Sequence, residues 1–126
     1  MFIAVCLDRL GLEDGRIKDS QISASTEWDS NRAATYARLN RPPQLGGMGG
    51  WTPKATETDP LPWIQVDLGV SMLVSGVVMQ GREDEWNRWV PKYRVESSDD
   101  GINWEYVRDA NQQHDTVRLL LYVYRG

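Results

Sequence analysis

The strongest constraint on the fold of this 126-residue chain is a run at positions 63–68, Trp-Ile-Gln-Val-Asp-Leu, in which apolar and polar residues alternate. Ile64, Val66 and Leu68 share one face of the predicted strand, because successive side chains of a strand point to opposite sides. This period of two is typical of a sheet with one buried face. Many short strands joined by turns favour a β-sandwich or a barrel. Further strands are predicted at about residues 72–80, 92–98, 103–108 and 118–124.

Residues that favour turns and loops separate these strands. Asp99-Asp100-Gly101 lies between two of them, and a glycine supplies the positive φ that such turns often require. Residues 27–39 are ambiguous, because propensity alone also allows a helix with Ser30 or Asn31 as its N-cap. A short edge element is predicted at residues 20–25, and loops at residues 41–50, 52–61 and 83–90.

Composition and charge describe an ordinary globular domain and exclude some partners. Apolar content of 40% and charged content of 25% suit one compact domain spanning residues 1–126. A net charge of −4 gives no support for nucleic acid as a partner. No apolar run is long enough for a transmembrane segment. The apolar opening, residues 1–7, is too short and too soon followed by charges for a signal peptide.

The chain shows no pattern typical of an enzyme. His114 is the only histidine, and no residue pattern proposes a nucleophile or an orienting acid for it. The acidic run 83–85 reads as solvated surface charge, and phosphate-loop, zinc-finger and EF-hand spacings are not found. We therefore expect no catalytic residues.

Three motifs together indicate a family. W-I-Q-V-D-L-G at 63–69, Q-G-R at 80–82 and Y-R-V-x-x-S-x-D-G-x-x-W at 93–104 resemble the discoidin family, the coagulation factor 5/8 type C domain. The opening L-G-x-E-x-G-x-I-x-D-x-Q-I-x-A-S at 10–25 is similar to that of the family as well. The resemblance covers about residues 6–109. It implies an all-β fold, an antiparallel β-sandwich or distorted jelly-roll barrel of the galactose-binding type, with ligand loops at one end. It also favours a projecting loop over a helix at residues 27–39.

The C-terminal part of the chain departs from the family. Cys6 stands where discoidin domains begin with a cysteine, but its usual partner and the closing strands are absent, and residues 110–126 do not align. One reading is a chain truncated in its last strands, with lower stability, open strand edges and dimerisation through Cys6. The other reading is that residues 116–124 supply a substitute strand.

The resemblance implies that three loops meet at one end of the barrel and bind the ligand: residues 27–32, 41–50 and 83–89. An exposed tryptophan gains from burial in a ligand, and an arginine fork suits a phosphate, sulfate or carboxylate. For Trp28 and Trp86 the alternative is that the ring folds back onto the barrel. Trp51, Trp63, Trp89 and Trp104 are expected in the core. The candidate ligand-binding residues are Trp28, Asp29, Asn31, Arg32, Leu45, Met48, Trp86, Asn87 and Arg88.

Several other polar residues are expected to be structural. Asp67 and Arg82 are predicted to form an ion pair that ties strands together, and Arg38 is given a similar role. Asp19 or Ser20 is predicted to cap nearby backbone groups. No cofactor is expected, although Ca²⁺ remains open, with Asp14, Asp19 and Asp29 as its possible ligands.

The resemblance implies an extracellular adhesion or recognition module, secreted or part of a cell-surface ectodomain. A protein such as collagen or a glycan suits a Trp-centred loop of mixed charge. An anionic phospholipid surface is the alternative, but the acidic residues of the loops weaken it. A carbohydrate-binding accessory domain of an enzyme is a third hypothesis.

Overall fold

The computed structural model describes residues 9–41, 49–70, 74, 77–81 and 93–107, and strand 117–122 by its backbone. Cys6, Arg82 and the loop residues Leu45, Met48, Trp86, Asn87 and Arg88 lie outside these ranges.

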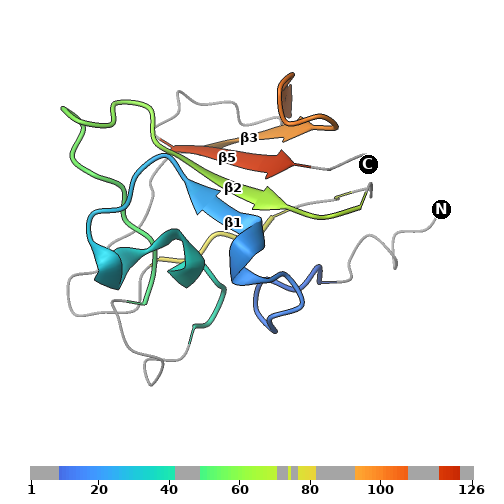
Figure 1. The fold of residues 1–126 in the computed structure, drawn as a ribbon, viewed down its shortest axis with the longest axis horizontal. Helices are drawn as coiled ribbons and strands as arrows, with labels where there is room; N and C mark the ends of the chain where they lie inside the picture. The colour runs from blue at the N-terminus through green and yellow to red at the C-terminus, as the bar shows by residue number, and fades with distance from the viewer. Residues whose placement is uncertain are drawn as a thin grey trace.

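The described strands form one five-stranded sheet (Figure 1). Its spatial order is β1-β2-β5-β3-β4. The pairs β1–β2 and β3–β4 are antiparallel, whereas β5 runs parallel to both of its neighbours, β2 and β3. The strands are β1 (Ile22–Ala24), β2 (Trp63–Asp67), β3 (Tyr93–Ser98), β4 (Glu105–Val107) and β5 (Val117–Tyr122).

The all-β class and most of the predicted strands are confirmed. β5 is the substitute strand that the sequence left open, and it fills the space between the inner edges of β2 and β3. The prediction of a strand at residues 72–80 is wrong for the residues described there, because 74 and 77–80 belong to no strand. Val74 and Val77 nevertheless pack against the core, so their apolar character reflects burial without backbone pairing.

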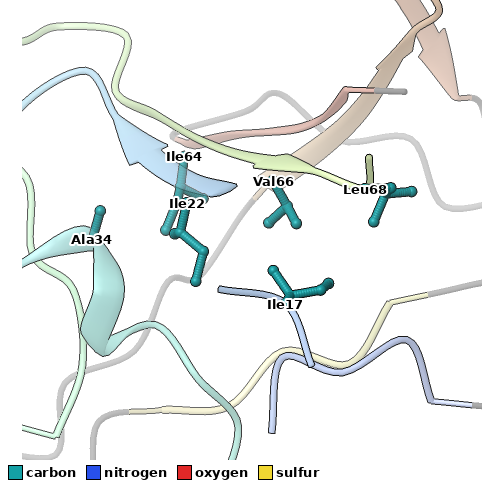
Figure 2. Close-up of a cluster of buried hydrophobic side chains, with 6 residues drawn as sticks. All are labelled: Ile17, Ile22, Ala34, Ile64, Val66 and Leu68. Carbon is teal, nitrogen blue, oxygen red and sulfur yellow. The ribbon is translucent and has the colours of Figure 1, made fainter. Parts of the chain in front are cut away.

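The core lies on one face of the sheet, as the alternation in β2 predicts (Figure 2). Ile64, Val66 and Leu68 are buried, while Gln65 and Asp67 between them are only half-buried. Ile22 of β1 is paired with Val66, so both side chains enter the same cluster. Among the residues that the structure describes, the buried cluster consists of Ile17, Ile22, Ala34, Ile64, Val66 and Leu68.

The expected loop at residues 27–39 is confirmed. It contains two 3₁₀ helices of three residues each, η2 (Ser30–Arg32) and η3 (Ala34–Tyr36). Ala33 separates them with extended backbone angles, which prevents a continuous helix. Ala34 then enters the core, so this loop is held against the sheet (Figure 2).

The predicted structural roles of the polar residues are confirmed in part. The Arg38 guanidinium donates to Asp19 Oδ1 at 2.7 Å and to Leu12 O at 2.9 Å, as its structural role predicts. The capping prediction for Asp19 and Ser20 is wrong. At the start of η1 (Asp19–Gln21), Gln21 Oε1 accepts from Lys18 N at 2.8 Å, and Gln21 Nε2 donates to Asp67 O at 2.7 Å.

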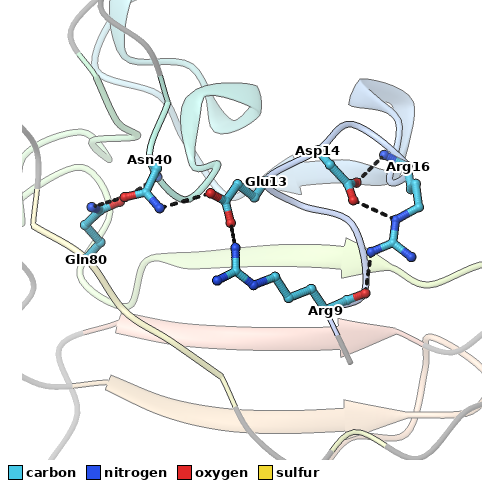
Figure 3. A network of polar contacts seen from close by, with 6 residues as sticks. All are labelled: Arg9, Glu13, Asp14, Arg16, Asn40 and Gln80. Carbon is cyan, nitrogen blue, oxygen red and sulfur yellow. Dashed lines mark hydrogen bonds and ion pairs between the residues drawn. The ribbon is translucent and has the colours of Figure 1, made fainter. Parts of the chain in front are cut away.

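A second polar network holds residues 77–81, which lack strand pairing (Figure 3). Asn40 N donates to Gln80 Oε1 at 2.7 Å, and Gln80 Nε2 donates back to Asn40 Oδ1 at 2.9 Å. Asn40 Nδ2 also donates to Glu13 Oε1 at 3.0 Å. Asn40 has φ 53, a conformation that asparagine tolerates better than most residues. Residues 77–81 are therefore tied to the opening loop by side chains.

The Asp99–Gly101 turn between β3 and β4 has the predicted chemistry. Gly101 has φ 75. The Asp100 carboxylate accepts from the backbone N–H groups of Asn103 and Ile102, each at 2.8 Å. These bonds favour the ionised form, so the pKa of Asp100 lies well below its usual value.

Candidate functional site

Trp28 projects from the loop that follows β1. Its side chain is 52% exposed, which favours the projecting arrangement over the one in which the ring folds back. Its backbone is held, because Trp28 N donates to Thr52 O at 2.7 Å. A large apolar side chain is thus displayed from a fixed stretch of backbone.

A buried carboxylate fixes the start of this loop. Asp59 is only 9% exposed and accepts hydrogen bonds from Ser25 Oγ and Thr26 Oγ1, each at 2.6 Å. The two hydroxyl oxygens accept in turn from Trp63 N and Lys54 N, both at 3.0 Å. We call Asp59, Ser25 and Thr26 the Asp59 anchor. No sequence pattern indicates this anchor, since Asp59 lies within a polar loop without periodicity.

Residues 51 and 52 hold the loop from a second direction. Trp51 Nε1 donates to Thr26 O at 2.8 Å, while the Trp51 ring packs against the core cluster. Thr52 N donates to Arg32 O at 3.3 Å. The structural role predicted for Trp51 is therefore confirmed. Trp63 and Trp104 are half-buried and are not members of the buried cluster.

Asp29 and Arg32 interact with each other inside the loop. Arg32 Nη1 donates to Asp29 Oδ2, forming an ion pair whose side chains are 24% and 41% exposed for Arg32 and Asp29. Asp29 Oδ1 also accepts from Asn31 N at 3.0 Å, so Asp29 is the N-cap of η2. Asn31 itself is exposed. The guanidinium proposed for anion binding is thus already engaged by a carboxylate.

Arg41, the first residue of the second predicted loop, is held against η3. The Arg41 guanidinium lies over the Tyr36 ring, 3.8 Å from its centroid, and Arg41 is only 9% exposed. This stack joins η3 to the first residue of loop 41–50. No sequence pattern indicates either residue as part of the site, and the meeting of the three loops stays a prediction.

The three carboxylates proposed for Ca²⁺ each contact a different arginine. Asp14 bonds Arg16 at 2.8 Å, Asp19 bonds Arg38 at 2.7 Å, and Asp29 bonds Arg32. Within the described ranges, no group of three or more His, Cys, Asp and Glu side chains is placed to hold a metal ion. The expectation of no cofactor, with Ca²⁺ left open, is not tested by these contacts.

The chain belongs to the F5/8 type C domain family, whose model matches residues 21–121. This match extends through most of β5, beyond the motifs that indicated the family. Domains of this family are extracellular binding modules with a β-sandwich fold.

Relatives of known identity agree with this assignment. The chain is 36% identical to neuropilin-1 of Homo sapiens over 110 residues, which cover 85% of this chain and 11% of that protein. It is 36% identical to lactadherin of Rattus norvegicus over 103 residues, 79% of this chain and 24% of lactadherin. Neuropilin-1a of Danio rerio is 37% identical over 112 residues, 86% of this chain and 11% of the relative. The chain thus spans between about a tenth and a quarter of these proteins. No helix in the described part of the chain is long and apolar enough to cross a membrane.

Proposed function

We propose that this domain is a non-catalytic extracellular recognition module that binds a protein such as collagen, or a glycan, through Trp28. The observation that carries the proposal is the 52% exposure of Trp28 on a loop whose backbone is hydrogen-bonded to Thr52. Leu45, Met48, Trp86, Asn87 and Arg88 complete the proposed site from the other two loops.

The exposed part of the tryptophan is large enough to contribute to affinity. A tryptophan side chain buries ~150–250 Å² in full, so covering the exposed half removes about 75–130 Å² from water. At ~25 cal/mol per Å², this burial favours binding by roughly 2–3 kcal/mol. Because the Asp59 anchor already orders the start of the loop, less of this gain is lost to ordering on binding.

The charges around Trp28 favour a protein or glycan over an anionic membrane. Residues 27–32 carry the carboxylates of Glu27 and Asp29 and the single guanidinium of Arg32, which leaves one net negative charge. The Asp29–Arg32 pair compensates the only cation of this loop. A negatively charged lipid surface would be repelled by the remaining carboxylate. A sugar or a protein of mixed charge accepts the same aromatic and polar groups.

Binding of the folded domain to collagen, to a glycan array and to phosphatidylserine vesicles, with and without Ca²⁺, tests this proposal. We expect binding to collagen or to a glycan, and loss of at least tenfold in affinity in Trp28→Ala. Ile102→Ala is the matched control, since it removes an 81% exposed apolar side chain from the turn between β3 and β4. Equal loss in both variants, or retention of binding in a folded Trp28→Ala, contradicts the proposal. Preference for phosphatidylserine in the wild type would favour the lipid alternative.

A further inference from the structure

We propose that Asp29 is a specificity-determining residue, because its carboxylate engages Arg32 and thereby withholds this cation from anionic surfaces. The inference rests on the proposed function, since it concerns the loop that carries Trp28. It adds that this loop rejects anionic surfaces and that Asp29 is the residue responsible.

Arg32 is the cation within residues 27–32, so it is a group that can contact an anion beside Trp28. It lies four residues after Trp28, and its backbone is fixed at both ends, with Arg32 N bonded to Asp29 O at 3.1 Å and Arg32 O accepting from Thr52 N. Its side chain is 24% exposed, so solvent reaches it. Among the described residues, the contact that neutralises its charge is the one to Asp29 Oδ2.

The Asp29–Arg32 pair has little value for stability. Exposed ion pairs contribute about 0–1 kcal/mol, because water screens the attraction and both side chains lose freedom. The fold therefore depends weakly on the charge of Asp29. The charge has a larger effect on what can approach, since a phosphate group would have to displace a carboxylate already in place.

The two oxygens of Asp29 separate its structural role from its electrostatic one. Oδ1 accepts from Asn31 N and caps η2, while Oδ2 holds the guanidinium. Asparagine is as good an N-cap as aspartate, so Asp29→Asn preserves the cap and removes only the charge. The net charge of residues 27–32 then changes from one negative charge to zero, with Arg32 released.

The chain offers a matched control in the opening loop. Asp14 accepts from Arg16 N at 3.0 Å and from Arg16 Nε at 2.8 Å, a carboxylate that bonds both a nearby backbone N–H and an arginine (Figure 3). Asp14→Asn makes the same change in net charge. This loop precedes β1, whereas the Trp28 loop follows it (Figure 1). An effect of net charge alone should therefore appear in both variants. An effect of the Asp29–Arg32 contact should appear only in Asp29→Asn.

Binding to vesicles of phosphatidylcholine with 0–40% phosphatidylserine, by sedimentation at low ionic strength without Ca²⁺, tests the inference. One elementary charge beside an anionic leaflet changes the affinity by about fivefold. We expect Asp29→Asn to bind phosphatidylserine vesicles about fivefold more tightly than the wild type. The gain should fall with added salt and should be absent in Asp14→Asn. Adding Arg32→Gln or Trp28→Ala to Asp29→Asn should remove the gain.

Equal behaviour of the Asp29→Asn and Asp14→Asn variants overturns the inference, as does a gain that survives Arg32→Gln. Asp29→Ser serves as a second neutral capping variant if Asp29→Asn folds poorly, which thermal unfolding reports. The proposed function fails separately, when Trp28→Ala retains collagen or glycan binding. If Trp28→Ala loses that binding while Asp29→Asn gains nothing on vesicles, the inference alone fails.

Discussion

At the scale of single residues, the geometry of the exposed loop depends most on Asp59. Its carboxylate is buried and joins Ser25 and Thr26 to the segment that precedes β2, 34 and 33 residues further along the chain. Both hydroxyl oxygens also accept hydrogen bonds from backbone N–H groups, so the position of Asp59 fixes the nearby backbone through these bonds. Trp28 follows Thr26 by two residues, so the position of its backbone depends on the same hydrogen bonds.

We expect Asp59→Ala to lower the free energy of unfolding by about 2 kcal/mol, since hydrogen bonds to a charged group are lost within a buried site. Urea denaturation followed by tryptophan emission measures this change. Glu57→Ala is the control, because Glu57 is exposed in the same turn and its removal should change stability by less than ~0.5 kcal/mol. Equal stability of Asp59→Ala and Glu57→Ala would contradict a structural role for the Asp59 anchor.

At the scale of secondary structure, β5 is the strand on which the sheet depends. It pairs with β2 over Trp63–Asp67 and with β3 over Tyr93–Ser98, and it is the last of the described strands in sequence order. Without it, β1–β2 and β3–β4 would be two separate hairpin-like pairs with open inner edges. Two-stranded units of this kind are marginally stable in water.

A proline at the centre of β5 tests this dependence. Leu120 is paired with Gln65 on one side and Glu96 on the other, so Leu120→Pro removes a ladder donor inside the sheet. We expect a loss of about 2–3 kcal/mol in the free energy of unfolding, from the missing bond and the unsatisfied carbonyl. Leu120→Val keeps the donor and should remain folded. Equal urea midpoints for the two variants would show that β5 is dispensable.

At the scale of the whole molecule, the arrangement of strands limits association through sheet edges. The outer strands of the described sheet, β1 and β4, have three residues each, and short edge strands offer little backbone for pairing with another copy. The long inner edges of β2 and β3 are covered by β5. The edge-driven dimer expected for a truncated chain is therefore not favoured.

We expect light scattering after gel filtration to give the monomer mass of 14.4 kDa in reducing buffer. Without reductant, a covalent dimer through Cys6 stays a prediction, and Cys6→Ser should abolish it. A dimer that persists in reductant would point to pairing of sheet edges. A dimer of Cys6→Ser under oxidising conditions would contradict the role of that cysteine.

Much of the fold could be predicted from the sequence because the signals are local. The alternation at 63–68 placed Ile64, Val66 and Leu68 in the core, since side chains of a strand alternate wherever the strand lies. Gly101 indicated the β3–β4 turn because a glycine readily adopts a positive φ, and its φ in the structure is 75. Part of the candidate site was equally local, because Trp28, Asp29 and Arg32 lie within five residues of one another.

By itself the sequence determined most of the strands, the turn between β3 and β4 and the family that the chain resembles. Only the tertiary structure decided the parallel position of β5 between β2 and β3, and that Val74 and Val77 are held without strand pairing. It also decided that Trp28 is exposed, that Asp29 engages Arg32, and that Asp59 holds the hydroxyls of Ser25 and Thr26. The physical reason is that residue periodicity follows from the local backbone. Strand order, burial and the partner of a charged group depend instead on which distant segments pack together.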